Sequence, residues 1–251
     1  MSQIVGVIPS RYGSTRLPGK SLIKLCGKPL VQWVYERAMQ AKKLNRVLVA
    51  TDDERIAKAV KNFGGEVVMT RADHPSGTDR IAEAVEGTDA GIVINIQGDE
   101  PLIEPSLIDE LATTLHDDAS WDMATAATPI TRKRDLKNPA CVKVVWGCDQ
   151  QALYFSRSLI PFPRDPQAAG EAPMHWRHIG IYAFRRVSLE QFVEHKPAPL
   201  EQIEKLEQLR ALAMGFRIKI LELPNDHGIG VDTPEDVPRA EALLRKHGLA
   251  K

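Results

Sequence analysis

Short apolar segments alternate with amphipathic segments along the first half of the chain. The apolar segments suit strands buried in a sheet, and they lie at residues 4–8, 46–50, 66–69 and 91–96. Apolar positions three and four apart predict helices at residues 30–41, 56–63, 78–86 and 105–115. This alternation predicts right-handed βαβ units and a mostly parallel central sheet flanked by helices.

The second half of the chain is less regular. Predicted strands lie at residues 123–129, 142–146, 179–184 and 217–223, and predicted helices at 200–214 and 234–247. The helix over 200–214 carries an apolar stripe of Leu200, Ile203, Leu206, Leu209 and Leu212. We expect one α/β domain over residues 1–251, with a smaller β-rich lobe at about 121–230 and a C-terminal helix, 231–251, that returns to the first part, 1–120.

Parallel sheets bind their ligands at the carboxyl ends of the strands. In this chain that edge contains residues 10–20, 51–53, 70–80 and 97–100. We therefore look for chemistry in these four segments first.

Composition narrows the classes of protein. The 33 Lys and Arg balance 33 Asp and Glu, which disfavours non-specific binding of nucleic acid. Three cysteines without a C-x-x-C pair disfavour a disulfide framework or a zinc ribbon, and we expect all three to be buried. The chain shows neither a signal peptide nor an apolar run long enough to span a membrane, so we expect a cytoplasmic protein.

The loop after the first strand is basic and rich in glycine. Arg11, Arg16 and Lys20 accompany Gly13 and Gly19. Glycine lets backbone N–H groups approach an anion, and the cations neutralise its charge, so this loop is suited to a polyphosphate. A solvated basic turn is the alternative.

This loop is not a P-loop. The first glycine of that motif would fall on Ser14, and Pro18 removes an amide from the cradle. Gly27 and Pro29 also interrupt the helix that should follow directly.

Two acidic residues are candidates for holding Mg2+. Asp99 follows an apolar strand, and Asp232 stands in a glycine-rich segment before the last helix. Asp99 could equally cap a turn. Thr233 as N-cap and Asp236 at the third helical position explain residues 233–236 as a helix start, but they leave Asp232 unexplained. Two acids beside a basic loop suggest metal-assisted phosphoryl or nucleotidyl transfer.

Other motifs are weaker. His175 and His178 stand at a strand entrance, which disfavours a metal pair. The segment 51–53 lacks the D-x-D of a glycosyltransferase, and we expect Asp53 to be a helix N-cap.

The motifs together resemble the 3-deoxy-manno-octulosonate (Kdo) cytidylyltransferase family, also called CMP-Kdo synthetases. The resemblance covers nearly the whole chain and rests on IPSRYGSTRLPGK (8–20), VATDD (49–53), MTRADHPSGTDR (69–80), NIQGDEP (95–101), VKVV (142–145), ALYFSRSLIPFPR (152–164), RHIGIYAF (177–184), PLEQIEKLEQLR (199–210) and GVDTPED (230–236). It implies a nucleotide-diphospho-sugar-transferase-like fold, a homodimer and transfer of CMP from CTP to Kdo for lipopolysaccharide assembly.

The resemblance also implies roles for individual residues. The nucleotide would bind to the first part of the chain, at Ser10, Arg11, Ser14, Lys20, Ser76, Gly77, Arg80 and Asp99. Kdo would bind to Arg16, Gln97, Arg157, His178, Tyr182, Glu207 and Gln208. Asp99 and Asp232 would hold Mg2+ and, with Lys20 and Arg11, carry the chemistry.

Several of these roles make chemical sense. A sugar acid brings a carboxylate for Arg157 and hydroxyls for His178, Tyr182 and Gln208. Glu207 and Gln208 could instead belong to a solvated helix face. An 8-amino-Kdo or a sialic acid is an alternative substrate, and a non-catalytic nucleotide-binding regulator is an alternative class.

Overall fold

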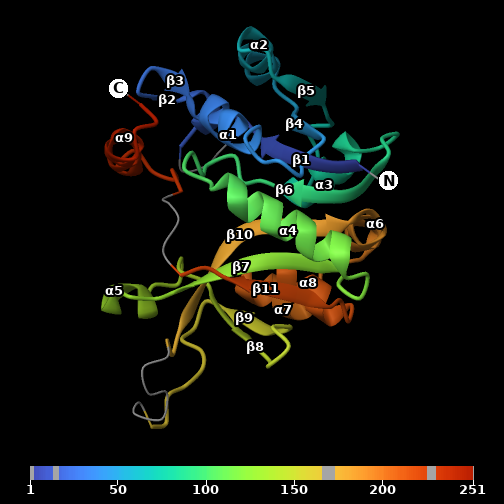
Figure 1. The fold of residues 1–251 in the computed structure, drawn as a ribbon, viewed down its shortest axis with the longest axis vertical. Helices are drawn as coiled ribbons and strands as arrows, with labels where there is room; N and C mark the ends of the chain where they lie inside the picture. Colours follow the sequence, from blue (N-terminus) through green and yellow to red (C-terminus); the bar gives the residue numbers. More distant parts are fainter. Residues whose placement is uncertain (1–2, 14–16, 166–172, 225–229, 251) are drawn as a thin grey trace. The chain divides into compact units, whose positions relative to one another are not determined.

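The structure is a computed structural model, and it describes residues 3–13, 17–165, 173–224 and 230–250. The chain forms two compact units, which we call unit 1 (Met1–Thr113 with His227–Lys251) and unit 2 (Thr114–Asp226) (Figure 1). The grouping of both units into a single domain stays a prediction.

Unit 1 contains a parallel sheet in the order β6-β1-β4-β5. Its strands are β1 (Gln3–Ser10), β4 (Arg46–Thr51), β5 (Glu66–Met69) and β6 (Ala90–Asn95). The two inner strands and β6 are almost continuously buried, because helices cover a parallel sheet on its faces. The predicted strands are confirmed.

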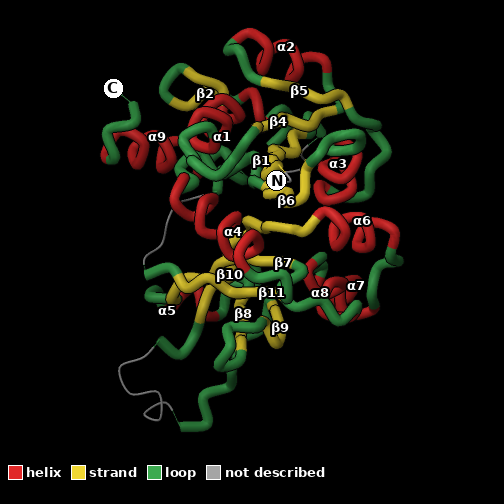
Figure 2. The backbone as a smooth tube through the Cα atoms, turned by 45° about the vertical axis from the view of Figure 1, so that its right-hand side comes forward, coloured by secondary structure: helices red, strands yellow, loops and turns green. Residues whose placement is uncertain are grey.

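The helices of unit 1 follow the predicted alternation (Figure 2). They are α1 (Leu30–Ala38), α2 (Glu54–Asn62), α3 (Gly77–Ala84) and α9 (Asp236–Lys246), and α4 (Pro105–Asp117) runs across the boundary to unit 2. Both α1 and α3 pack against β1. Asp53 caps α2 as predicted, since its carboxylate accepts the Arg55 N–H at 2.9 Å.

The C-terminal helix α9 returns to the beginning of the chain. It packs against a short hairpin of β2 (Lys24–Leu25) and β3 (Lys28–Pro29), which follows the one-turn helix η1 (Lys20–Leu22) (Figure 1). The shared core contains Leu17, Leu25, Leu30, Trp33, Leu102, Val231, Ala240 and Leu244. This cluster brings the segment around residue 232 to the basic loop.

Unit 2 is the β-rich lobe. Its sheet has the order β11-β7-β10-β8-β9, with strands β7 (Met123–Pro129), β8 (Lys143–Trp146), β9 (Ala152–Ser156), β10 (Trp176–Arg185) and β11 (Ile218–Glu222). Only the β11–β7 pair among these is parallel. Its own helices are α5 (Lys133–Leu136), α6 (Arg186–Glu194), α7 (Pro199–Glu204) and α8 (Gln208–Ala213).

The prediction of one continuous helix over residues 200–214 is wrong. The chain breaks it between α7 and α8 at Lys205, whose φ of 53° is left-handed. The reason is a buried ion pair in which Glu201 Oε1 lies 2.6 Å from Arg210 Nη2. In one straight helix these residues would be about 13 Å apart along the axis, too far to pair.

The apolar stripe predicted on that helix is wrong in the same place. Leu200 and Ile203 are 47% and 76% exposed, whereas Leu206 and Leu209 are buried. The break turns the two halves of the stripe in different directions.

Two smaller predictions are also wrong. Helix α9 begins at Asp236, and Thr233 is not its N-cap, because the Thr233 hydroxyl donates to the Asp236 carboxylate instead of accepting from the helix. Only Cys141 is buried, whereas Cys26 is half-buried and Cys148 is exposed.

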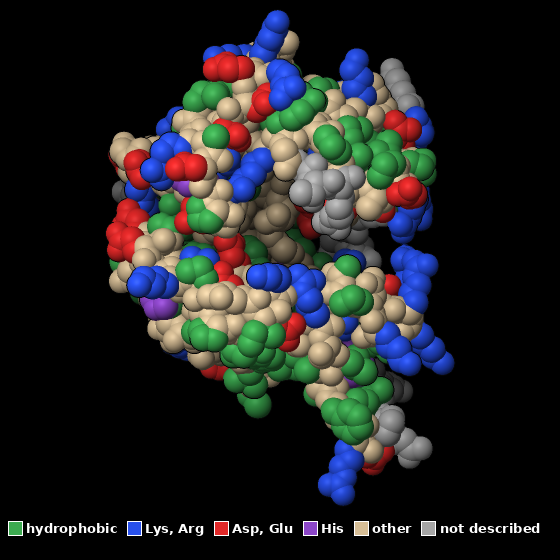
Figure 3. All heavy atoms as spheres, turned by 180° about the vertical axis from the view of Figure 1, so that it is seen from behind, with side chains coloured by type: hydrophobic (Ala, Val, Ile, Leu, Met, Phe, Trp, Pro, Cys, Tyr) green, Lys and Arg blue, Asp and Glu red, His purple; other side chains and the backbone are tan. Residues whose placement is uncertain are grey.

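The surface carries charges of both signs. On the face shown in Figure 3, Lys and Arg side chains alternate with Asp and Glu, as the zero net charge suggests. No helix in the described part of the chain is long and apolar enough to cross a membrane.

Candidate active site

The carboxyl end of β1 presents buried polar groups. Ser10 ends the strand and is 2% exposed, and Arg11 follows it. The Ser10 Oγ and the Arg11 Nη2 are both buried, and neither has a hydrogen-bond partner among the described residues. A buried donor left in this state costs free energy, which a ligand with acceptor oxygens would recover.

Arg80 brings a second guanidinium to this region from α3. Its side chain is fully buried, and its Nη1 donates to Thr70 Oγ1 at 2.5 Å. Its Nη2 lies 2.9 Å from Asp52 Oδ1, but the two atoms are not aligned as a hydrogen bond. Burial lowers the pKa of Arg80, the Asp52 charge opposes this, and the Arg11 charge adds to it. The two arginines therefore repel one another, which favours an anion between or beside them.

The residues before Arg80 begin α3. Ser76 is the N-cap, because its Oγ accepts the N–H groups of Thr78 and Asp79 at 3.1 and 3.3 Å. The Ser76 hydroxyl donates to Asp79 Oδ2 at 2.6 Å. Ser76 and Gly77 thus present a helix N-terminus at the edge predicted for the ligand.

Lys20 lies between the two predicted metal ligands. Its Nζ is 2.7 Å from Asp99 Oδ2 and 3.1 Å from Asp232 Oδ1. Burial would lower the pKa of Lys20, but the two carboxylates outweigh it, so that the pKa is raised. A backbone bond from Val231 N to Asp99 O, 2.9 Å long, fixes the two acidic segments to one another.

These two carboxylates fit Mg2+. The described residues contain no group of three or more His, Cys, Asp or Glu side chains that could hold a metal. Mg2+ does not need such a group, because it commonly takes one or two carboxylates and completes its shell with phosphate oxygens and water. Two carboxylate oxygens already converge on one cation here.

The turn between β6 and Asp99 requires a glycine. A Cβ on Gly98 would lie 3.0 Å from Pro9 O and 3.4 Å from Ser10 Oγ. Gly98 therefore lets the Asp99 turn approach the end of β1. Gln97, which precedes Gly98 in the chain, is half-buried.

In unit 2, His178 and Tyr182 form an aromatic cluster on β10. Their ring centroids are 5.3 Å apart, and the His178 ring also meets Phe155 edge-on at 5.0 Å. Thr125 Oγ1 lies 3.0 Å from His178 Nε2 and donates to Ile181 O at 2.7 Å, so the ring donates to the hydroxyl.

The environment keeps both rings neutral. Burial, assisted by the positive charge of Arg177, lowers the pKa of His178 to about 3. Burial, assisted by the negative charge of Glu207, raises the pKa of Tyr182. His178 and Tyr182 are thus fixed as neutral hydrogen-bonding groups at physiological pH.

The break between α7 and α8 positions the remaining predicted residues of unit 2. Gln208 is the first residue of α8 and is 5% exposed, so it does not belong to a solvated face. The Arg157 guanidinium donates to Glu204 O, Pro139 O and Lys205 O at 2.6, 2.9 and 3.1 Å. Backbone carbonyls therefore hold Arg157 against the end of α7.

Comparison with known proteins identifies the family of the chain. Residues 5–220 match the family described as Cytidylyltransferase. The 3-deoxy-manno-octulosonate cytidylyltransferase of Bdellovibrio bacteriovorus is 49% identical over 98% of this chain and 100% of its own length. That of Syntrophobacter fumaroxidans is 51% identical over 96% of this chain and 97% of its own length.

The chain belongs to the 3-deoxy-manno-octulosonate cytidylyltransferase family.

Solved structures support the same membership. CMP:2-keto-3-deoxy-manno-octonic acid synthetase complexed with CTP superimposes with a TM-score of 0.92 and 45% identity, over 98% of this chain and 100% of the other. A 4-diphosphocytidyl-2C-methyl-D-erythritol synthase from Anaerococcus prevotii shares only the fold, with a TM-score of 0.63 and 12% identity over 97% of this chain and 96% of its own. The α/β fold of the cytidylyltransferases is thereby confirmed.

The residues that the family resemblance selected divide between the units. Those assigned to nucleotide and metal lie in unit 1, and those assigned to the sugar lie in unit 2, apart from Arg16 and Gln97. Ser14 and Arg16 fall outside the described residues.

Some residues that shape these cytidylyltransferase sites escaped the sequence analysis. Gly98 has a role that only the close approach of β1 reveals. Thr125 supports His178 from a neighbouring strand, and the Glu201–Arg210 ion pair creates the turn that presents Gln208. The burial of Glu201 is visible only in the structure, so the sequence alone contains no signal for the break.

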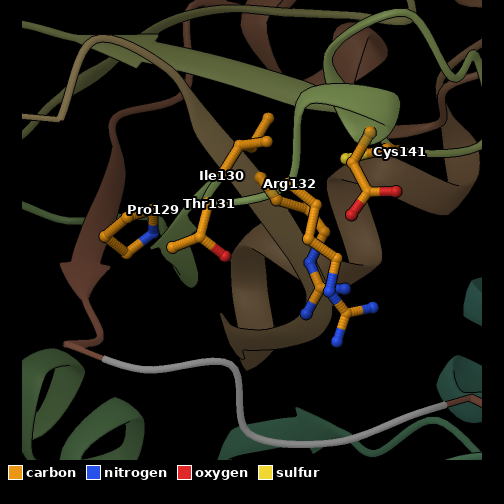
Figure 4. A pocket seen from close by; sticks show the side chains of 7 residues that line it. Pro129, Ile130, Thr131, Arg132 and Cys141 are labelled. Carbon is orange, nitrogen blue, oxygen red and sulfur yellow. The ribbon is translucent and has the colours of Figure 1, made fainter.

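A small pocket in unit 2 involves none of the predicted site residues (Figure 4). It is lined by Pro129, Ile130, Thr131, Arg132, Asp135, Cys141 and Arg177. Since it holds water-sized space only, we assign no part of the family's chemistry to it.

Proposed function

We propose that this chain transfers CMP from CTP to the anomeric 2-hydroxyl of Kdo and releases pyrophosphate. The oxygen of that hydroxyl attacks the α-phosphorus, and the bond from the α-phosphorus to the β-phosphate oxygen breaks. Its proton passes to a base, for which Asp99 is our candidate. Relatives that are about half identical over almost their whole length carry the name of this reaction.

The observation that carries the proposal is the set of buried donors at the carboxyl end of β1. Ser10 Oγ and Arg11 Nη2 have no hydrogen-bond partner within the described ranges. Arg80 is fully buried, and it is close enough to Arg11 for the Arg11 charge to lower its pKa. Donors of this kind match the acceptor oxygens of a triphosphate.

Each residue of unit 1 then has a task. Arg11 and Ser10 bind phosphate oxygens, and the buried Arg80 adds positive charge to this region. Lys20 stabilises the charge that develops on the departing pyrophosphate. Ser76 and Gly77 offer a helix N-terminus to the nucleotide.

Asp99 and Asp232 would hold Mg2+. When bound there, the ion lowers the pKa of the attacking hydroxyl and offsets charge in the transition state.

The residues of unit 2 suit a polyhydroxylated acid. His178 and Tyr182 are neutral, so they recognise hydroxyls through donors and acceptors with fixed protonation. Gln208 adds an amide, Glu207 a carboxylate, and Arg157 is the candidate for the sugar carboxylate. Gln97 and Arg16 complete this proposed set.

The cellular context is part of the proposal. A Kdo cytidylyltransferase supplies an activated sugar for lipopolysaccharide, and we propose that this chain does so in the cytoplasm as a homodimer. Its partners are then the small molecules CTP and Kdo, with no nucleic acid or membrane among them.

Pyrophosphate release tests the reaction. The purified protein is given Mg2+ and Kdo with CTP, UTP, ATP or GTP in separate assays, with EDTA and omission of the sugar as controls. Release that prefers CTP and needs both Kdo and metal is the expected result. Release with 8-amino-Kdo or a sialic acid but not with Kdo would replace the acceptor, and binding of CTP without any release would identify a regulator.

A further inference from the structure

Lys20 occupies the position where the two predicted metal ligands approach one another. Its Nζ lies 2.7 Å from Asp99 Oδ2 and 3.1 Å from Asp232 Oδ1, so one ammonium balances two carboxylates. Mg2+ on the same oxygens would approach them to about 2.1 Å. The ammonium and the metal ion exclude one another, because they compete for the same oxygens and carry charge of the same sign.

The head group of Lys20 can leave while its backbone stays in place. The Lys20 N–H donates to Leu17 O and the Lys20 carbonyl accepts from Ile23 N, both at 3.1 Å. These bonds fix the backbone at the start of η1. The Lys20 side chain is 19% exposed. Its ammonium is carried on a flexible four-carbon stem, so the head group can change position by rotation about the bonds of that stem.

The backbones of Asp99 and Asp232 are held independently of Lys20. Val231 N donates to Asp99 O at 2.9 Å, and Asp232 N donates to Asp236 Oδ2 at 3.1 Å. Departure of the ammonium would therefore leave the two acidic residues side by side and remove the cation that both carboxylates contact.

The same loop contains the donors that would bind the anion to which the ammonium is attracted. Gly19 N donates to Tyr12 O at 2.9 Å and closes the loop, so Lys20 stands beside the segment that begins with Ser10 and Arg11. This bond ties the residue before Lys20 to the residue after Arg11, so an anion bound by Ser10 and Arg11 would lie on the same closed loop as the lysine.

We propose that Lys20 is an internal counter-ion, which keeps Asp99 and Asp232 closed to a divalent metal until the phosphates of a nucleotide attract its ammonium. Metal and nucleotide then bind with positive cooperativity, so each ligand increases the affinity for the other by the same factor. The proposal rests on the proposed function only for the identity of the anion as a nucleoside triphosphate.

The test is binding of Mn2+ alone to the nucleotide-free protein, followed by electron paramagnetic resonance of the free ion. Lys20→Met should bind Mn2+ about tenfold more tightly than the unchanged protein, because it removes one unit charge at contact distance. Lys20→Gln, which is neutral but polar, should do the same and guards against a folding defect of the methionine variant. Lys24→Met, at an exposed lysine four residues later, should leave the affinity unchanged.

A second measurement adds α,β-methylene CTP, with the Mn2+ bound by free nucleotide subtracted. The nucleotide should tighten Mn2+ binding to the unchanged protein by about tenfold and tighten it much less in Lys20→Met, in which the competing charge is already absent. Folded Lys20 variants with unchanged or weaker Mn2+ affinity would overturn the proposal. Failure of the proposed function is seen separately, as absence of pyrophosphate release by the unchanged protein.

Discussion

In unit 1, the described neighbours satisfy the groups assigned to the nucleotide and metal only in part. Ser10 Oγ and Arg11 Nη2 are buried without hydrogen-bond partners in the described structure, and the Lys20 ammonium contacts both the Asp99 and Asp232 carboxylates. In unit 2, the His178 and Tyr182 rings assigned to the sugar are neutral, and the Arg157 guanidinium is already held. His178 meets Thr125, and backbone carbonyls hold Arg157. We propose that the contrast follows from the ligands. Phosphate oxygens would satisfy the donors of Ser10 and Arg11, a divalent cation would balance the two carboxylates, and a sugar would need donors and acceptors whose protonation is fixed.

The largest expected effect comes from the acidic pair. Asp232→Ala should lower turnover by about a thousandfold, the scale for loss of a group that stabilises the transition state electrostatically. The fold should be retained, because Asp232 is a half-buried loop residue. Steady-state pyrophosphate release with saturating Mg2+ and a circular dichroism melt measure the two properties.

Glu235→Ala is the matched control for this prediction, since Glu235 is an exposed acid in the same segment. It should keep normal turnover. Near-normal turnover of Asp232→Ala would exclude the metal role and make the acidic pair purely structural.

The next effect tests the unmatched donor. Arg11→Met should raise the KM for CTP between about ten- and a hundredfold, as expected for the loss of a charge-assisted contact to phosphate. Its Tm should stay equal or rise, because the substitution removes a buried donor that lacks a partner in the described structure.

Arg46→Met provides the control. Arg46 begins β4, at the opposite end of the sheet, and forms only an exposed ion pair with Glu66. A marked fall in the Tm of Arg11→Met with unchanged KM would mean that Arg11 is a structural residue, and the contrast between the units would disappear.

A smaller effect tests the neutral histidine of unit 2. The pKa of His178 falls from 6.5 to about 3 on folding, so the unfolded chain binds a proton that the folded chain does not. The contribution of neutral His178 to the free energy of unfolding is therefore fully present above pH 6.5. This contribution is lost as the pH falls toward 3, by at most ~1.4 kcal/mol per pH unit.

Urea unfolding at pH 7, 6, 5 and 4 measures this slope. His178→Gln should be less sensitive to acid than the unchanged protein over this range, and His195→Gln, on an exposed histidine, serves as the control. Equal slopes for the His178 variant and the unchanged protein would show that His178 is accessible to protons, as a charged ligand of the sugar would be.

The smallest effect tests the break between α7 and α8. Ile203→Gln should change the free energy of unfolding by less than about 0.5 kcal/mol, because Ile203 is 76% exposed. Leu209→Ala, at a side chain that is 1% exposed, should cost about 2–5 kcal/mol. Comparable costs for both variants in urea titrations would favour the continuous apolar stripe that the periodicity predicted.

The strands of unit 1 and most helices follow from the sequence, since each depends on neighbours a few positions away. Glu66–Met69 and Met123–Pro129 have the predicted bounds, and Asp53 caps its helix as expected. The motifs at residues 8–20 and 95–101 likewise identified the family, whose membership the relatives confirm.

Contacts between distant residues were beyond such reasoning. The ion pair of Glu201 with Arg210 is incompatible with one straight helix, and the chain breaks at Lys205, whose φ is left-handed. Thr233 is a local exception. It does not act as the N-cap, because its hydroxyl donates to the Asp236 carboxylate three residues later.

The sequence by itself determined the main strands and helices of unit 1, the basic loop and the acidic candidates, because periodicity, turn residues and motif spacing are local properties. The tertiary structure alone decided that Lys20 would lie between Asp99 and Asp232, 79 and 212 positions away. That arrangement depends on the core shared by the β2–β3 hairpin and α9, and burial of apolar surface over such separations leaves no local pattern in the chain.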